Sequence, residues 1–89
     1  MGFSDELERL VTLSRHQIEV VCADETQLPE HIELCREQFD EHLAAFDAAQ
    51  ERDDVEADFH WQEAAAWRET AAILTVMVDR AAGATRRSA

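Results

Sequence analysis

The sequence predicts an all-α protein, built as an antiparallel three-helix bundle with a long third helix. Hydrophobic residues make up 46% of the 89 residues and recur at the three-to-four spacing of amphipathic helices. Glycine and proline occur only as Gly2, Pro29 and Gly83, too few for the turns of a multi-stranded sheet. The length suits one small domain. We therefore expect a single helical domain over residues 1–83 and a flexible tail over residues 84–89.

The first predicted helix spans residues 4–23. Ser4 is placed as the N-cap, and Asp5 and Glu6 follow in the first turn, where the helix dipole favours acidic side chains. The predicted buried stripe consists of Leu7, Leu10, Val11, Ser14, Ile18 and Val21.

The second predicted helix spans residues 29–52, with Pro29 at its first position, where a missing N–H costs no hydrogen bond. Its core face is Leu28, Ile32, Cys35, Phe39, Leu43 and Phe46. Its opposite side carries an acidic face, which we define as Glu33, Glu37, Asp40 and Asp47. Such a face is suited to steering a basic protein surface toward the molecule.

The third predicted helix spans residues 54–82. Asp53 and Glu56 have the spacing of a capping box, and Gly83 is placed as the residue that ends the helix. A break before this helix is required because Phe39 and Phe59 would otherwise point in nearly opposite directions on one rod.

Two neighbouring stripes of the third helix are apolar. We expect the first stripe to complete the bundle core: Val55, Phe59, Ala66, Ile73 and Met77. The second stripe is His60, Ala64, Trp67, Ala71, Leu74 and Val78. It fits either a wide core face or self-association as a two-fold homodimer through Trp67, Leu74 and Val78.

Trp61 lies on a more polar side of the same helix, near Arg68. A tryptophan beside small residues and an arginine has the composition of a binding hot spot. The same pair also fits a cation–π contact over the end of the bundle.

Three interpretations stay open for Cys22, His31 and Cys35. The two cysteines fit small buried apolar residues, a disulfide across the first two helices, or ligands of a zinc or other transition-metal site together with His31. The sequence contains neither CxxC nor HxxxH, so no motif selects the metal site, and we expect no cofactor.

The chain is strongly acidic, with 20 acidic and 8 basic residues and a net charge of −12. This charge opposes direct binding to nucleic acid or to an anionic membrane. It fits a surface that meets a basic protein partner, and equally the composition of a salt-adapted or GC-rich source. No apolar run reaches the roughly 18 residues of a membrane span, and we expect a cytoplasmic protein.

The function predicted from these features is a non-enzymatic protein–protein interaction module that regulates or inhibits a protein partner, with Trp61, Arg68 and the acidic face as the binding residues. No Gly-rich phosphate loop, tyrosine or Ser/His/Asp set suggests catalysis. Three alternatives remain: an inhibitor that mimics nucleic acid through the acidic face, a metal-binding or redox protein, and a structural subunit.

Overall fold

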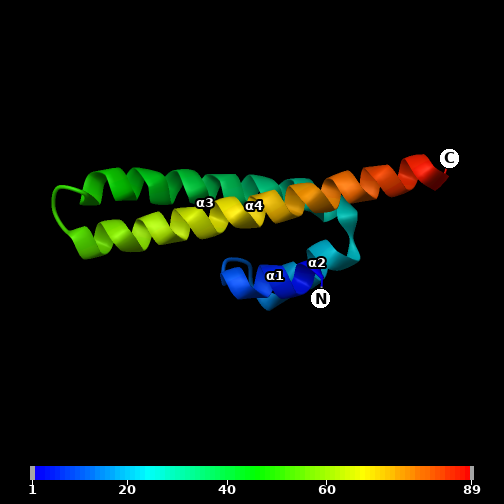
Figure 1. Cartoon of the computed structure of the whole chain (residues 1–89), viewed down its shortest axis with the longest axis horizontal. Coiled ribbons are helices and arrows are strands. Elements are labelled where there is room, and N and C mark those ends of the chain that lie inside the picture. The colour runs from blue at the N-terminus through cyan, green and yellow to red at the C-terminus, as the bar shows by residue number, and fades with distance from the viewer. Residues whose placement is uncertain (1, 89) are drawn as a thin grey trace.

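The computed structural model describes residues 2–88, with side chains through Gly83. Every regular element in this range is helical, which confirms the predicted all-α class (Figure 1). The elements are α1 (Phe3–Leu10), α2 (Arg15–Ala23), a single 3₁₀ turn η1 (Glu25–Gln27), α3 (Leu28–Ala49) and α4 (Asp54–Ser88).

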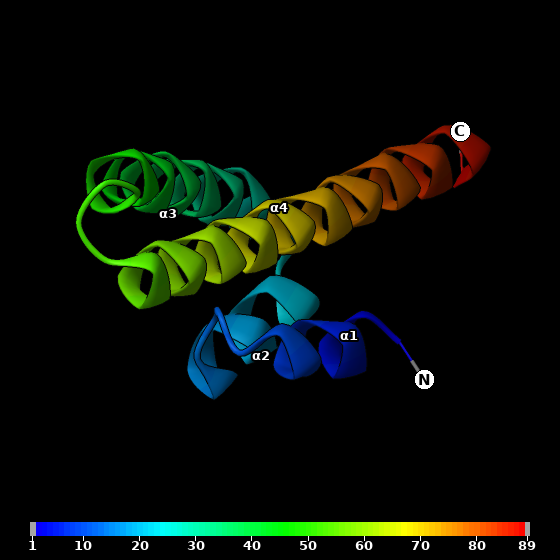
Figure 2. The same ribbon diagram turned by 60° about the vertical axis from the view of Figure 1, so that its left-hand side comes forward.

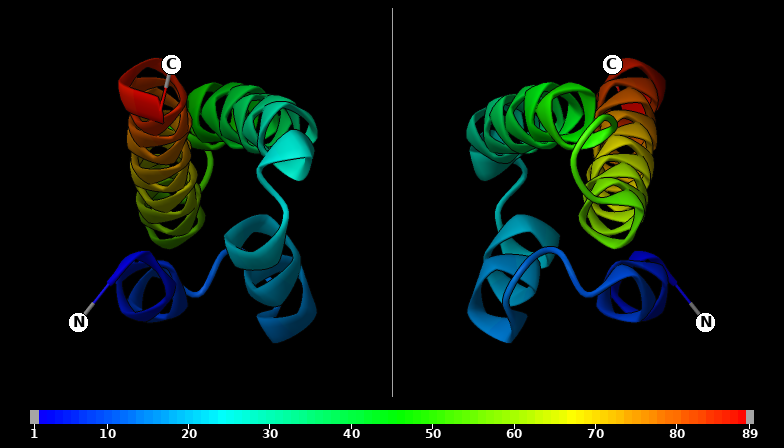
Figure 3. Two further views of the ribbon diagram at one scale, coloured as in Figure 1. Left: turned by 90° about the vertical axis from the view of Figure 1, so that its right-hand side faces the viewer. Right: turned by 90° about the vertical axis from the view of Figure 1, so that its left-hand side faces the viewer.

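Helices α3 and α4 form a long antiparallel hairpin, the spine of a molecule measuring 56 × 20 × 17 Å (Figure 1). Helix α4 has 35 residues and α3 has 22, so α4 is longer by about 20 Å at 1.5 Å per residue. Its C-terminal end extends beyond α3 (Figure 2). Helices α1 and α2 lie on one side of the hairpin, where they form a short additional layer (Figure 3).

The predicted single helix over residues 4–23 is wrong, because the chain breaks into two helices between residues 11 and 14. Val11 adopts a left-handed conformation with φ of 54° and ends α1. Ser14 then starts α2 through a capping box: its hydroxyl accepts from the Gln17 N–H at 3.1 Å, and its N–H donates to Gln17 Oε1 at 2.8 Å. The layer beside the hairpin is therefore much shorter than a third helix of full length.

The predicted N-cap of the first helix is also wrong. Helix α1 begins at Phe3 and Gly2 occupies the cap position, without a side-chain hydrogen bond. Helix α3 begins at Leu28, one residue before the predicted start, and Pro29 lies in its first turn.

The predicted break between the second and third helices is confirmed, although α3 ends at Ala49, three residues early. Asp53 Oδ1 accepts hydrogen bonds from the N–H groups of Val55 at 3.0 Å and Glu56 at 3.3 Å, which confirms Asp53 as a cap. Helix α4 continues past Gly83 to Ser88, so Gly83 does not end it. Flexibility of residues 84–89 stays a prediction, and Ala89 lies outside the described residues.

The hydrophobic core lies where α1 and α2 meet the hairpin. Its buried members are Leu7, Leu13, Ile18, Val21, Leu28, Cys35 and Leu74. We call this part of the molecule the proximal half. The part of the hairpin formed by residues 36–66, next to the α3–α4 turn, is the distal half, and α1 and α2 do not reach it (Figure 1).

The structure divides the first predicted stripe of α4 and buries much of the second. Ile73 and Met77 of the first stripe pack against the core cluster, as predicted. Val55 and Phe59, predicted as core, are 79% and 54% exposed, whereas Leu74 of the second stripe is completely buried. Val11, another predicted core residue, is 82% exposed. The reason is that α3 packs against the second stripe. The α1–α2 layer is too short to cover the distal end of the first stripe.

Candidate protein-interaction surface

A small pocket of about 100 Å³ opens between α3 and α4 in the distal half. Its lining residues are Phe39 and Leu43 from α3, and Trp61, Ala64, Ala65 and Arg68 from α4. We call this pocket the Trp61 groove. It brings together Trp61 and Arg68, the two residues that the sequence suggested as a binding pair.

The groove exists because small residues form its floor and large ones form its walls. Ala64 is 2% exposed and lets the two helices approach closely. Trp61 cannot fit between them, so it lies at the rim with 53% of its surface exposed, and its ring packs against Phe46 at a centroid distance of 5.1 Å. An exposed aromatic ring held in place by a neighbour is a favourable anchor for a partner.

Arg68 lies seven residues after Trp61, about two helical turns along the same side of α4. It is exposed and supplies a cationic group at an otherwise apolar pocket. The ring contact of Trp61 is with Phe46, whereas the cation–π pair found in the described part of the chain joins Arg80 and Phe3 at 5.3 Å. The hot-spot interpretation of Trp61 therefore fits the geometry better than a Trp61–Arg68 cation–π contact.

The predicted acidic face is exposed along α3 at all four positions: Glu33, Glu37, Asp40 and Asp47. Residues 36–66 carry ten acidic side chains and two arginines. The groove therefore opens in a strongly negative part of the surface, which attracts basic groups at long range.

The predicted self-association stripe forms part of the monomer core. Leu74 is completely buried, and Trp67 and Val78 are partly buried against the same core cluster. Helix α3 and the α1–α2 layer cover these side chains, so they do not form a free surface for a second copy. Formation of a homodimer stays a prediction.

Cys22 is exposed and Cys35 is buried, and both are free thiols, so the disulfide alternative is not formed. His31 Nδ1 is hydrogen-bonded to the carbonyl oxygen of Gln27 at 2.8 Å. Among the side chains of residues 2–83, no group of three or more His, Cys, Asp and Glu residues is arranged to hold a metal ion. The predicted Cys22–His31–Cys35 set is therefore not assembled.

Burial raises the pKa of both thiols, that of Cys35 to about 11. Cys35 therefore stays protonated at neutral pH and acts as a small apolar core residue.

A histidine pair that the sequence did not reveal joins the two long helices. His42 Nδ1 and His60 Nδ1 lie 3.0 Å apart, and His60 Nε2 lies 3.8 Å from Glu56 Oε1. The Phe59 ring is edge-on to both imidazoles, at centroid distances of 6.3 Å from His42 and 5.1 Å from His60. The tautomers of the two imidazole rings decide which of them donates this hydrogen bond. Sequence spacing alone could not show that these histidines face each other.

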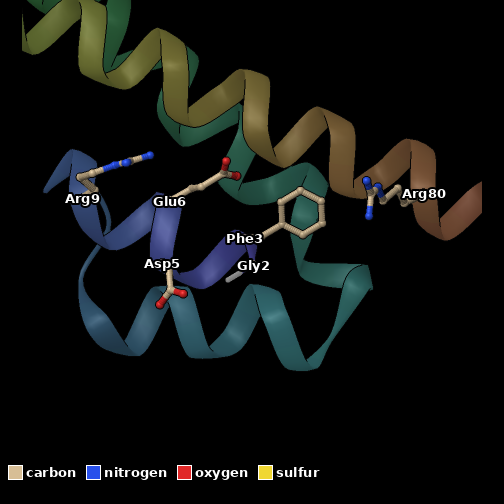
Figure 4. Close-up of a pocket in the computed structure, with 6 residues that line it drawn as sticks. All are labelled: Gly2, Phe3, Asp5, Glu6, Arg9 and Arg80. Atoms are coloured by element: carbon tan, nitrogen blue, oxygen red, sulfur yellow. The ribbon is translucent and has the colours of Figure 1, made fainter.

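A larger hollow of about 620 Å³ separates α1 from the C-terminal part of α4 (Figure 4). Its lining residues are Gly2, Phe3, Asp5, Glu6, Arg9 and Arg80. Figure 4 shows Phe3 projecting from α1 toward α4, with Arg80 nearby. Charges of both signs surround one aromatic ring that Arg80 already contacts, so the lining of this hollow is more polar in proportion than that of the Trp61 groove.

No helix in the described range combines the length and hydropathy that a bilayer crossing requires.

The sequence model of one protein family, described as Chap-C: TY-Chap C-terminal domain, matches residues 1–81. This match indicates a chaperone-like module that interacts with protein partners. No curated protein and no solved structure matches the chain.

Proposed function

Because the chain belongs to the TY-Chap C-terminal domain family, we propose that it holds a segment of a protein partner in the Trp61 groove and thereby regulates or inhibits that partner. The observation that carries the proposal is the half-exposed Trp61, fixed against Phe46 beside a small apolar pocket. The proposed role is non-enzymatic, needs no cofactor and is exerted in the cytoplasm.

The groove and its surroundings define the chemistry of the partner segment. An apolar side chain of the partner enters between Leu43 and Trp61, where water is displaced from apolar surface. Arg68 donates hydrogen bonds to backbone carbonyl or carboxylate oxygens next to that anchor. Lysine or arginine residues farther along the segment face the acidic side chains of the distal half.

Affinity capture from the source cells tests this proposal. Immobilised wild-type protein should retain a defined set of partners, and Trp61→Ala should lose them. The matched control is Val76→Ala, because Val76 is a 45% exposed apolar residue of α4 outside the groove. Equal recovery by Trp61→Ala and the wild type would rule out the groove as the binding site.

A second candidate function is nucleic-acid mimicry, in which the acidic face occupies a phosphate-binding site of the partner. The supporting observation is that all four residues of this face are exposed on one helix, over about 21 Å from Glu33 to Asp47. Under this alternative, the double substitution Glu33→Arg and Glu37→Arg abolishes capture, and rising salt weakens it steeply. Under the groove proposal, Trp61→Ala has the larger effect and salt has a modest one.

A further inference from the structure

We propose that a second surface of the distal half binds a basic amphipathic helix from a protein partner. The surface consists of Val55, Phe59, His42 and His60, and we call it the Phe59 patch. The bound helix continues the layer that α1 and α2 begin, and it covers the part of the hairpin that this layer leaves open.

The first observation is the continuity of the Phe59 patch with an interface inside the chain. Thr12, in the link between α1 and α2, contacts Thr70 of α4 through their hydroxyl groups at 2.6 Å. Phe59 precedes Thr70 by eleven residues, which places it within about 20° of the same direction and about 16 Å along α4. The α1–α2 layer and the Phe59 patch therefore lie on the same face of α4, one after the other.

The second observation is that this uncovered face is apolar. Val55 is 79% exposed and Phe59 is 54% exposed. The half-buried His42 and His60 rings extend the patch, and their facing nitrogens already bond to each other at 3.0 Å. A partner that covers the patch consequently buries aromatic surface without leaving these two nitrogens unpaired.

The third observation is the negative charge around the Phe59 patch, which favours a basic partner over a second copy of this chain. The exposed carboxylates of Glu56 and Asp58 adjoin Phe59, in a half of the molecule with ten acidic residues and two arginines. A second copy docked through the same face would bring like charges together, at a cost in free energy. A helix with an apolar face bordered by lysine or arginine pairs with these carboxylates instead.

The Phe59 patch is separate from the Trp61 groove. Trp61 follows Phe59 by two residues, so the two side chains point about 160° apart around α4. The two surfaces can therefore be disrupted one at a time.

Fluorescence anisotropy with a labelled synthetic peptide tests the proposal. The probe is an amphipathic Leu/Lys peptide of about 18 residues, long enough to form a helix, and its counterpart carries Glu in place of Lys. We expect the Leu/Lys peptide to bind the wild type and Phe59→Ser to weaken it by about tenfold or more. Val76→Ser, which removes an exposed apolar side chain outside the patch, and Trp61→Ala should both leave binding unchanged. Circular dichroism verifies that each variant is folded.

Three outcomes would overturn the Phe59 patch proposal: equal affinity for Phe59→Ser and the wild type, equal affinity for the Leu/Glu and Leu/Lys peptides, or sedimentation showing a wild-type dimer that Phe59→Ser dissociates. The last outcome would identify a second copy as the occupant. The capture experiment with Trp61→Ala tests the Trp61 groove, and the peptide experiment with Phe59→Ser tests the Phe59 patch. Either proposal can therefore fail while the other holds.

Discussion

The proximal and distal halves of the α3–α4 hairpin are held together by different kinds of side chain. In the proximal half, large aliphatic residues of α1, α2, α3 and α4 share one core, with Leu7 and Leu74 completely buried. In the distal half, the buried hydrophobic residues are alanines: Ala49, Ala57 and Ala64. The larger apolar side chains there are half-buried or exposed, because only two helices pack in this half.

This difference means that the proximal half supplies most of the stability of the fold, whereas the distal half carries the exposed aromatic side chains. Burial of apolar area stabilises the fold, and most of the large buried side chains are proximal. Close packing of alanines keeps the distal helices together but leaves Phe59 and Trp61 half exposed. We therefore expect the distal half to open at a lower free energy than the proximal half and to gain stability when a partner binds.

The largest expected effect is that of Leu74→Ala, which creates a cavity in the proximal core. We expect a loss of about 3 kcal/mol in the free energy of unfolding, measured by urea denaturation. Trp61→Ala, at the distal surface, should cost less than about 1 kcal/mol because the side chain is already half exposed. Similar losses for both variants would contradict the division into a stabilising half and a binding half.

The next effect concerns the contact that attaches the α1–α2 layer to α4. Thr70 is completely buried; its hydroxyl donates to the carbonyl oxygen of Ala66 at 2.8 Å and accepts from Thr12 at 2.6 Å. Thr70→Val should lower the free energy of unfolding by about 1 kcal/mol.

The matched control is Thr75→Val. Thr75 makes the same hydroxyl-to-carbonyl bond, to Ala71 at 2.8 Å, but is exposed. Urea denaturation should show little change for this variant. Equal effects of the two substitutions would mean that the Thr12 contact contributes no stability.

A gain in stability is expected at the break between α1 and α2. Val11 has a left-handed backbone conformation, which is unfavourable for a β-branched residue, and its side chain is 82% exposed. Val11→Gly should raise the free energy of unfolding by up to about 1 kcal/mol. Val76→Gly, at an exposed position within α4, should lower it. A loss of stability in Val11→Gly would show that the break is not strained.

The smallest effect appears only at alkaline pH. Because burial raises the pKa of Cys35 from 9.0 to about 11, the folded state keeps a proton that the unfolded chain releases. Burial of this protonated thiol therefore makes its full contribution to the free energy of unfolding below pH 9. That contribution is lost as the pH rises toward 11. Urea denaturation across this range should show that the free energy of unfolding declines with pH, and Cys35→Ala should make this decline smaller.

The burial of Cys35 can also be tested with a thiol reagent. At pH 8 the reagent should modify Cys22 first, and equal rates for both cysteines would contradict the burial of Cys35.

Much of the fold was predictable because it depends on local patterns. Helical periodicity gave the all-α class, and Pro29 and Asp53 marked the starts of α3 and α4. The break in the first helix was also present in the sequence, since Ser14 and Gln17 have the spacing of a capping box. The prediction places Ser14 in a buried stripe instead, and so it continues the first helix to residue 23 and misses the break after Leu10.

The exposure of Val55 and Phe59 on α4 could not be predicted, because it depends on how far each helix reaches along its neighbour. The spacing of Trp61 and Arg68 placed them on one side of a helix, and the pocket does include both. The pairing of His42 with His60 needs the relative register of α3 and α4, which no pattern within one helix supplies.

The Thr12–Thr70 contact also has a kinetic consequence, since it joins residues separated by 58 positions. Helices α3 and α4 are linked by a short turn, so their contacts close small loops and should form early in folding. Docking of the α1–α2 layer closes a much longer loop and should come last. During synthesis, Leu7 and Ile18 leave the ribosome well before Leu74. These apolar side chains therefore stay exposed to solvent until the C-terminal part of the chain is available to pack against them.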